Sequence, residues 1–368
     1  MQIPTTKRVS MIELFYDLVF AYMIAQATDL IHHLKNGVVN STTLIIFVFV
    51  VIVFINSWMV QSVFTNRYGS SSWTDIIFAF IDMMIVLYMS NVFSDTLNAN
   101  LKPFFIAAGC LSLTLLLQYL IQFWRTNNHI DRQISKSFAI ILLIRTVSLL
   151  AAGYLPQRVG IPLAIIGVLV SWIAPSFTGK YTKHHPIIFS HLLERLTLLT
   201  IITFGETIVG IAGFFTKSSF RLTSILIFLI VASLFFSYIV EFDHLIDDKR
   251  TGETGNLLIY LHYPIIFGLS LVTVALRFIE ETDANQTFAI TFLYCGISLM
   301  YIGLFLANHY NQKKNRIGHL IPTAFTLLTM LGFAVSLIFQ SFDVTATITA
   351  TVTMINSALL IRHSATYA

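Results

Sequence analysis

Long apolar stretches alternate with short polar connections along the whole chain. Twelve of these stretches contain roughly 20 mostly apolar residues, the length at which an α-helix crosses the hydrocarbon core of a bilayer. The pattern therefore predicts an all-α integral membrane protein. The predicted spans are 11–34, 43–64, 73–94, 103–124, 134–155, 158–176, 187–215, 221–241, 255–279, 286–308, 317–340 and 344–361.

The composition agrees with a chain that lipid surrounds. Hydrophobic residues make up 56% and charged residues 11% of the 368 positions, and the mean hydropathy is +0.78. A soluble domain of this composition would lack the polar surface that water requires. The bilayer is thus an expected partner, and nucleic acid is not, because a net charge of +4 is explained by an asymmetry between loops.

The basic residues indicate the orientation of the chain. In one set of alternate connections we count fourteen Lys and Arg, against six in the opposite set, while Arg145 and Arg195 fall within spans. Cytoplasmic connections retain Lys and Arg in excess. The set with more Lys and Arg includes the segments before the first span and after the last span, so both termini are predicted to be cytoplasmic.

The chain also resembles itself at an offset of 180 or 181 residues. This offset predicts two parallel six-helix repeats, 1–180 and 181–368, that are joined near 177–186 and related by an axis along the membrane normal. The matching polar landmarks are Glu13 with Glu194, Ser57 and Trp58 with Ser237 and Tyr238, and Asp82 with His262.

Acids outnumber bases within the predicted spans. Each charge near the bilayer centre costs about 2.5–3.5 kcal/mol on the insertion scale, so these side chains are expected to face the bundle interior. Two arginines cannot neutralise all of these acids, so the remaining carboxyl groups must be protonated, bind a cation or face water. Each of these outcomes indicates movement of protons or cations. We single out the acids Glu13, Asp17, Asp82, Glu194 and Glu206 and the bases Arg145 and Arg195.

Glu13 and Asp17 lie four residues apart, on one face of the first span. Two such carboxyl groups could share a proton or hold a cation. For Glu13 there is an equally good structural explanation, a capping box that begins at Ser10, and the box at Ser72 explains Asp75 in the same way. Asp17 has no cap available and is the better candidate for a functional site.

Arg195 and Glu206 share a face of the seventh span but lie roughly 16 Å apart along its axis, so other helices must supply their partners. The repeat places Arg195 near the acids of the first span and Glu206 deeper in the bundle. The glycines around Glu206 permit either a local helix break near a substrate or close helix packing. These glycines are Gly205, Gly210 and Gly213.

Two further polar residues lie deep within spans. Asp82 is either a site residue or the ion-pair partner of Arg145. His262 precedes Pro264, which frees a backbone carbonyl, so it is either a titrating group or a hydrogen-bonded histidine at a kink.

Motifs for covalent or cofactor chemistry are not found. The sequence contains no P-loop, nucleophile elbow, HExxH or dinucleotide fingerprint, and Cys110 and Cys295 have no partner at metal-ligand spacing. We expect no cofactor and no metal, and an enzyme is disfavoured. The candidates for binding a substrate or ion are Asp17, Glu206, Asp82, Glu194, Arg195, Glu13, His262 and Arg145.

Three motifs carry a family resemblance. Glu-Leu-Phe-Tyr-Asp-Leu-Val-Phe at 13–20 resembles the opening signature of the bacterial low temperature requirement A (LtrA) family. Glu194–Arg195 with Gly205–Glu206 is similar to a second motif, and His262 with Pro264 and Gly268 to a third. Ala21 and Thr203 replace expected aliphatic residues. The resemblance implies a multi-pass protein of the bacterial plasma membrane, named for a cold-growth phenotype, and it implies no mechanism.

The leading functional hypothesis is a proton-coupled secondary transporter with an acidic site between the repeats, lined by Asp17, Asp82, Glu194, Arg195 and Glu206. A proton or cation channel is the first alternative, by analogy with otopetrins, which also have two six-helix halves. The second is a protein that transports nothing, such as a lipid enzyme or a sensor supporting the envelope in the cold. The sequence does not identify the small solute or ion, which could include protons, and it leaves open whether the chain forms a homo-oligomer.

Overall fold

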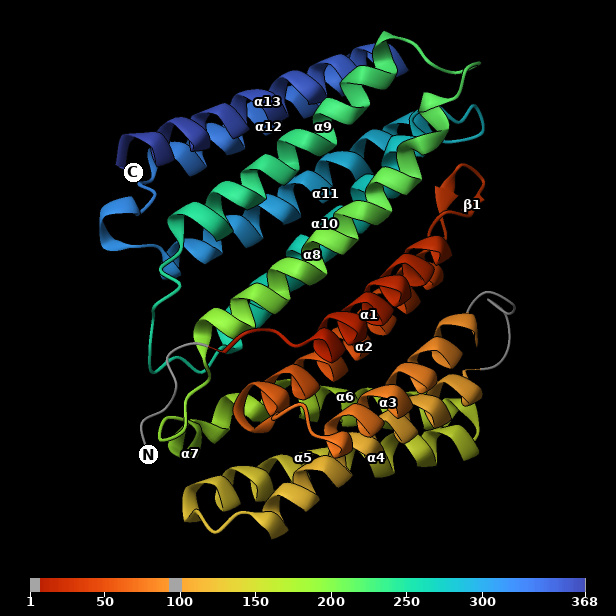
Figure 1. Cartoon of the computed structure of the whole chain (residues 1–368). Coiled ribbons are helices and arrows are strands. Elements are labelled where there is room, and N and C mark those ends of the chain that lie inside the picture. The colour runs from red at the N-terminus through yellow and green to blue at the C-terminus, as the bar shows by residue number, and fades with distance from the viewer. Residues whose placement is uncertain (1–6, 93–100, 368) are drawn as a thin grey trace. The chain divides into compact units, whose positions relative to one another are not determined.

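The computed structural model describes residues 7–92 and 101–367. Twelve of its helices are long and apolar enough to cross a membrane, which confirms the predicted number of spans. The described part of the chain is otherwise nearly free of strand, with one two-residue pair, β1 (Leu34–Lys35) and β2 (Val38–Val39) (Figure 1). The predicted end of the third span, at 94, lies outside the described residues.

The chain forms two compact units. The first unit consists of residues 1–30, 46–199 and 248–257. Within it α3 packs against α1 and α4, and α5 packs against α4 and α6. Its elements are α1 (Met11–Leu30), α2 (Ser41–Tyr68), α3 (Trp73–Val92), α4 (Lys102–Arg125), α5 (His129–Tyr154), α6 (Gln157–Ile173), η1 (Ala174–Thr178), α7 (Gly179–Thr182) and the first half of α8 (Phe189–Ile211).

The second unit consists of residues 31–45, 200–247 and 258–368. Within it α13 packs against α9 and α12, and α12 packs against α11. Its elements are the second half of α8, η2 (Ala212–Phe215), α9 (Leu222–Ile239), the π-helix η3 (Val240–Leu245), α10 (Asn256–Phe278), α11 (Gln286–Ala307), η4 (Asn308–Tyr310), η5 (Lys313–Asn315), α12 (Leu320–Phe339) and α13 (Phe342–Tyr367).

Polar caps set several helix boundaries. The predicted capping boxes are present, since Glu13 Oε2 accepts from the Ser10 N–H at 2.9 Å and Asp75 Oδ2 from the Ser72 N–H at 3.0 Å. The fifth span begins five residues earlier than predicted, at His129, because the Asn128 side chain accepts from the Ile130 N–H at 2.9 Å. A capped polar turn thus extends a helix beyond its apolar segment.

Glycines bring α10 and α11 into backbone contact. A Cβ on Gly268 would lie 2.5 Å from the carbonyl oxygen of Gly296, and a Cβ on Gly303 would lie 2.7 Å from that of Leu261. Side chains larger than hydrogen do not fit at such separations without movement of the backbone. The two helices therefore pack as closely as helices with small residues at the interface can.

Gly268→Ala is expected to destabilise the chain by about 1–3 kcal/mol, the usual penalty for overpacking. Thermal unfolding in detergent, followed by circular dichroism, measures the effect. Gly205→Ala on α8 is the matched control, because no described atom lies within 4 Å of its Cβ, and alanine favours a helix by up to about 1 kcal/mol. Equal unfolding midpoints for the two variants would contradict the close α10–α11 contact.

Candidate functional site

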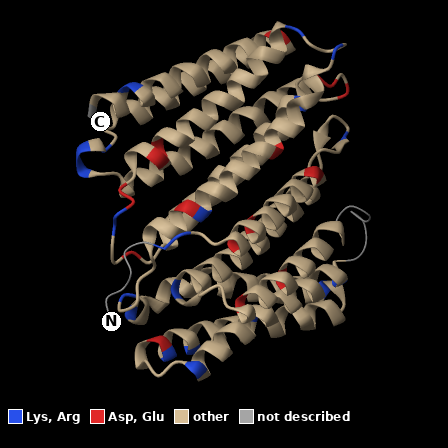
Figure 2. Cartoon of the chain, in the orientation of Figure 1, with Lys and Arg blue, Asp and Glu red and all other residues tan. Residues whose placement is uncertain are grey.

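Charged residues are sparse within the spans and gather near helix ends and loops (Figure 2). In the first unit, however, α1 and α8 bring several ionisable side chains together beside polar residues of α2. Glu13 and Asp17 come from the first two turns of α1, and Arg195 comes from the second turn of α8. The expectation that Arg195 lies beside the acids of the first span is confirmed.

Asp17 and Arg195 form a buried bidentate ion pair. Their side chains are 0% and 1% exposed, and the guanidinium Nη2 and Nε lie 2.5 and 3.1 Å from Oδ1 and Oδ2 of Asp17. The Trp58 indole N–H donates to Oδ1 at 2.7 Å, and the guanidinium carbon lies 5.3 Å from the centre of that indole. Fork geometry, the extra donor and the cation–π contact favour the ionised pair.

Glu13 joins this pair from the first turn of α1. Its Oε1 lies 3.7 Å from Arg195 Nη1, and its carboxylate lies 3.4 Å from Nε2 of His191, one turn before Arg195 on α8. Arg195 Nη1 also donates to the Thr65 hydroxyl at 3.0 Å. Glu13 thus caps α1, as the capping box predicts, and it also belongs to the charged cluster.

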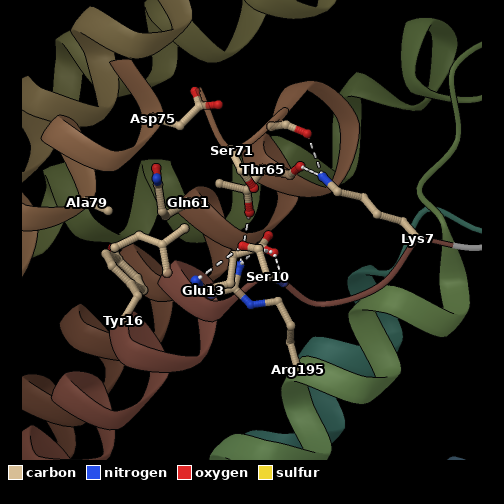
Figure 3. A pocket seen from close by; sticks show the side chains of 12 residues that line it. Lys7, Ser10, Glu13, Tyr16, Gln61, Thr65, Ser71, Asp75, Ala79 and Arg195 are labelled. Carbon is tan, nitrogen blue, oxygen red and sulfur yellow. Dashed lines mark hydrogen bonds and ion pairs between the residues drawn. The ribbon is translucent and has the colours of Figure 1, made fainter. Parts of the chain in front are cut away.

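A small cavity adjoins the cluster (Figure 3). Its volume is about 20 Å³, room for about one water molecule, and Glu13, Gln61 and Arg195 line it together with Lys7. Lys7 Nζ donates to the carbonyls of Thr65 and of Gly69, the latter at 2.8 Å. An ammonium group at the carboxyl end of α2 complements the helix dipole.

Burial lowers the pKa of Lys7 below its ordinary value of 10.5, against the opposing effect of Glu13. Between the folded and the unfolded pKa, the folded state therefore binds fewer protons at Lys7 than the unfolded state does. The free-energy cost of burying the charged ammonium is fully present below the folded pKa. Stability at this site rises as pH rises through the folded pKa toward 10.5.

Lys7→Met is expected to remove this pH dependence. Unfolding midpoints of the wild type and of Lys7→Met, measured in detergent at mildly and at strongly alkaline pH, give the comparison. The wild type should gain stability relative to the variant as pH rises. A constant difference between the two chains would show that the Lys7 ammonium is not held in a desolvated position.

Asp82 lies at the middle of α3, fully buried. The pairing with Arg145 that we considered is wrong, because the Asp82 carboxylate instead accepts from the Thr114 hydroxyl and, at 3.5 Å, from the Gln118 amide of α4. Gln61 Nε2 in turn donates to Gln118 Oε1 at 3.1 Å. A line of amides therefore leads from the cavity to a carboxyl group at the middle of a span.

Arg145 connects three helices of the first unit. From α5 it donates to Asn56 Oδ1 at 2.6 Å and to the Ser57 hydroxyl at 2.5 Å, both on α2. The Ser171 hydroxyl of α6 donates to the same Asn56 oxygen at 2.9 Å. These contacts give Arg145 neutral acceptors and a structural role.

The remaining predicted residues lie apart from the charged cluster. Glu194 is exposed, although its neighbour Arg195 is buried. Glu206 belongs to the second unit, where it is half-buried. His262 is fully buried in the same unit, with Nδ1 2.7 Å from the Leu258 carbonyl and Nε2 3.1 Å from the Tyr238 hydroxyl. The structure thus favours the hydrogen-bonded interpretation of His262.

Several contributing residues were missed in the sequence. Thr114 and Gln118 are four residues apart on a mostly apolar helix, a spacing that places both on one face. Polar side chains also recur along the second half of α2, and this recurrence was a usable signal. The missed residues are Lys7, Trp58, Gln61, Thr65, Thr114, Gln118 and His191.

Metal binding has no obvious location in the described residues, since they contain no group of three or more His, Cys, Asp or Glu side chains that could hold an ion. The arrangement instead combines a fixed ion pair, a water-sized cavity and a buried carboxyl group with neutral partners. Such a set can hold charge in place and exchange a proton.

Comparison with known proteins gives a family. No curated protein and no solved structure matches the chain. The family model described as bacterial low temperature requirement A protein (LtrA) matches residues 8–356, a range that contains all three motifs, the Asp17–Arg195 pair and Asp82. The chain is therefore a multi-pass membrane protein that belongs to the bacterial low temperature requirement A family.

Proposed function

We propose that the chain is a proton-coupled secondary transporter of the bacterial plasma membrane, in which Asp82 takes up and releases the coupling proton. The observation that carries the proposal is the set of partners of Asp82. It is fully buried at mid-span and held by Thr114 and Gln118, which are neutral. Burial favours its neutral form, while the two donors favour its charged form.

Asp17 is less suited to this role. Protonation of Asp17 would remove the counter-ion of a buried arginine, at an expense of several kcal/mol. The bidentate contact with Arg195 therefore supports a fixed, structural charge, with Arg195 holding Asp17 ionised. Asp82 can change its charge without breaking an ion pair.

The line Gln61–Gln118–Asp82 supports access from the cavity. Gln61 lines the cavity, and its Oε1 is buried without a hydrogen-bond partner among the described residues. A water molecule at this oxygen would be the first carrier of the proton. Beyond this water, Gln61 donates to Gln118, and the Gln118 amide donates to Asp82 when it is charged.

Corresponding contacts within the two units support the two proposed repeats, 1–180 and 181–368, although residues 31–45 belong to the second unit and residues 181–199 and 248–257 to the first. Helix α2 bonds to α6 through Asn56 and Ser171, and α9 bonds to α13 through Thr223 and Asp343 at 2.6 Å. In the same way α5 packs on α4 and α6, while α12 packs on α11 and α13. Repeats that move as bodies are the usual architecture of secondary transporters.

A proton channel is the second candidate, because a buried carboxyl group linked to a water-sized cavity would also serve passive conduction. Reconstitution in liposomes with an internal pH dye, a proton gradient and a membrane potential separates the two. Proton entry that requires an added solute supports the transporter. Entry without solute supports the channel, and entry equal to that of empty liposomes across a broad solute screen contradicts both. Glu194, Glu206 and His262 stay candidates for solute binding.

A further inference from the structure

A second acid in the spans lacks a counter-ion. Glu241 is the second residue of the π-helix η3, which continues α9. Its side chain is 0% exposed, and neither carboxylate oxygen has a hydrogen-bond partner among the described residues. An ionised carboxylate in this position would cost several kcal/mol.

The backbone around Glu241 is fixed. The Ile246 N–H donates to the Glu241 carbonyl at 3.1 Å, five residues back, as a π-helix requires. The segment that follows pairs with the loop after α11, where the Gln312 N–H donates to the Leu245 carbonyl at 3.0 Å and Ile246 forms a bridge with Asn311. This pairing places the Asn311 amide next to the Glu241 carboxyl group.

Titratable groups on the surrounding elements do not neutralise Glu241. No ion pair joins it to a described base, and the lysines and arginine of the adjoining loop are exposed. The titratable or charged groups on η3 and the elements around it include Tyr238 on α9, Asp243 and His244 on η3, His262 on α10, Tyr301 on α11, His309 and Tyr310 on η4, Lys313 and Lys314 on η5, Arg316 before α12, and Arg362 and His363 on α13.

We propose that Glu241 is a proton-binding site, which gives the second unit a protonatable carboxyl group of its own. A proton removes the buried charge and gives the carboxyl group a hydrogen-bond donor of its own. The Oδ1 atom of Asn311 is likewise a buried acceptor with no partner among the described residues. Short π-helical segments often occur at functional sites.

The proposed repeat relates this site to the first unit. An offset of 180 residues carries Gln61 to Glu241, just as it carries Asp82 to His262. Gln61 belongs to the line that reaches Asp82, so the second unit has its carboxyl group at the position of the amide. The inference extends the proposed function to the second unit, but Glu241 can bind a proton whether or not the chain transports.

Infrared difference spectroscopy of the purified chain in nanodiscs tests the proposal without a flux assay. The carbonyl stretch of a protonated, desolvated carboxyl group should be present in the wild type at neutral pH and lose intensity in Glu241→Gln. The part of the band that Glu241→Gln removes should persist in Asp82→Asn. Glu281→Gln, at an exposed loop residue, is the control. Glutamine resembles a protonated glutamic acid, so the variant should fold.

Two results would overturn the proposal. An unchanged carbonyl spectrum in Glu241→Gln would show that Glu241 is ionised. A rise in the unfolding midpoint on replacing choline chloride by sodium chloride, present in the wild type and lost in Glu241→Gln, would show that a metal cation occupies the site. Loss of the band with no sodium effect supports the proton.

Discussion

Replacing Arg195 by glutamine is expected to destabilise the chain by about 3–5 kcal/mol, because the Asp17 carboxylate would stay buried without its counter-ion. The effect is large since both partners are almost fully desolvated, and Arg195 also contacts Glu13 and Thr65. Unfolding by denaturing detergent in mixed micelles, with the wild type alongside, gives the change in the free energy of unfolding.

Arg221→Gln is the matched control. Arg221 also forms an ion pair, 2.7 Å from Glu280, but the two side chains are 52% and 39% exposed. Such surface pairs contribute about 0–1 kcal/mol. The double variant Asp17→Asn with Arg195→Gln should recover part of the loss, because neither charge is then left alone. If Arg195→Gln were no more destabilising than Arg221→Gln, the buried pair would not stabilise the first unit.

Asp82→Asn is expected to reduce proton flux in liposomes roughly tenfold or more, equivalent to about 1.4 kcal/mol in a barrier. Asparagine has nearly the shape of aspartic acid, and its Oδ1 can still accept from the Thr114 hydroxyl. Its amide nitrogen cannot accept from Gln118 as Asp82 Oδ2 does, and it cannot bind and release a proton. The change therefore removes the chemistry while it leaves the packing of α3 against α4 in place. The initial rate of dye quenching per reconstituted protein is the measured quantity.

Asp283→Asn is the control for this substitution, at an exposed loop acid outside the spans. Its flux should equal that of the wild type. Gln118→Leu should also slow the flux, since it interrupts the line from Gln61 to Asp82. Full flux in Asp82→Asn, with the wild type clearly active, would exclude Asp82 as the proton carrier.

The spans were predictable from sequence because about 20 consecutive apolar residues have few uses other than crossing a bilayer. Their ends were less so, since caps such as Asn128 add polar turns that a hydropathy pattern does not include. Glu241 shows the same limit. Glu241 was the last residue of the predicted eighth span, a position where an acid is common. In the structure η3 extends the helix to Leu245, and the Glu241 side chain is buried.

Within the candidate site, sequence reasoning predicted the neighbourhood of Asp17 and Arg195 but not their other partners. The internal offset aligned the first span with the seventh, which was enough to bring Arg195 near the acids. Trp58 and His191 could not be assigned, because an indole or imidazole in an apolar helix usually fills space. Asp82 bonds to Thr114 and Gln118 of α4 rather than to Arg145. The charges of Asp82 and Arg145 alone cannot predict this choice of partners.

The contact between α10 and α11 restricts how the second unit can move. A Cβ on Gly268 would lie 2.5 Å from the Gly296 carbonyl oxygen. If one helix slid by one residue, about 1.5 Å along its axis, a side chain would replace the glycine and collide with the backbone of the other helix. The two helices therefore travel as one rigid body, and their amide hydrogens should exchange with solvent among the slowest in the chain. Any hinge in this unit lies outside the α10–α11 pair.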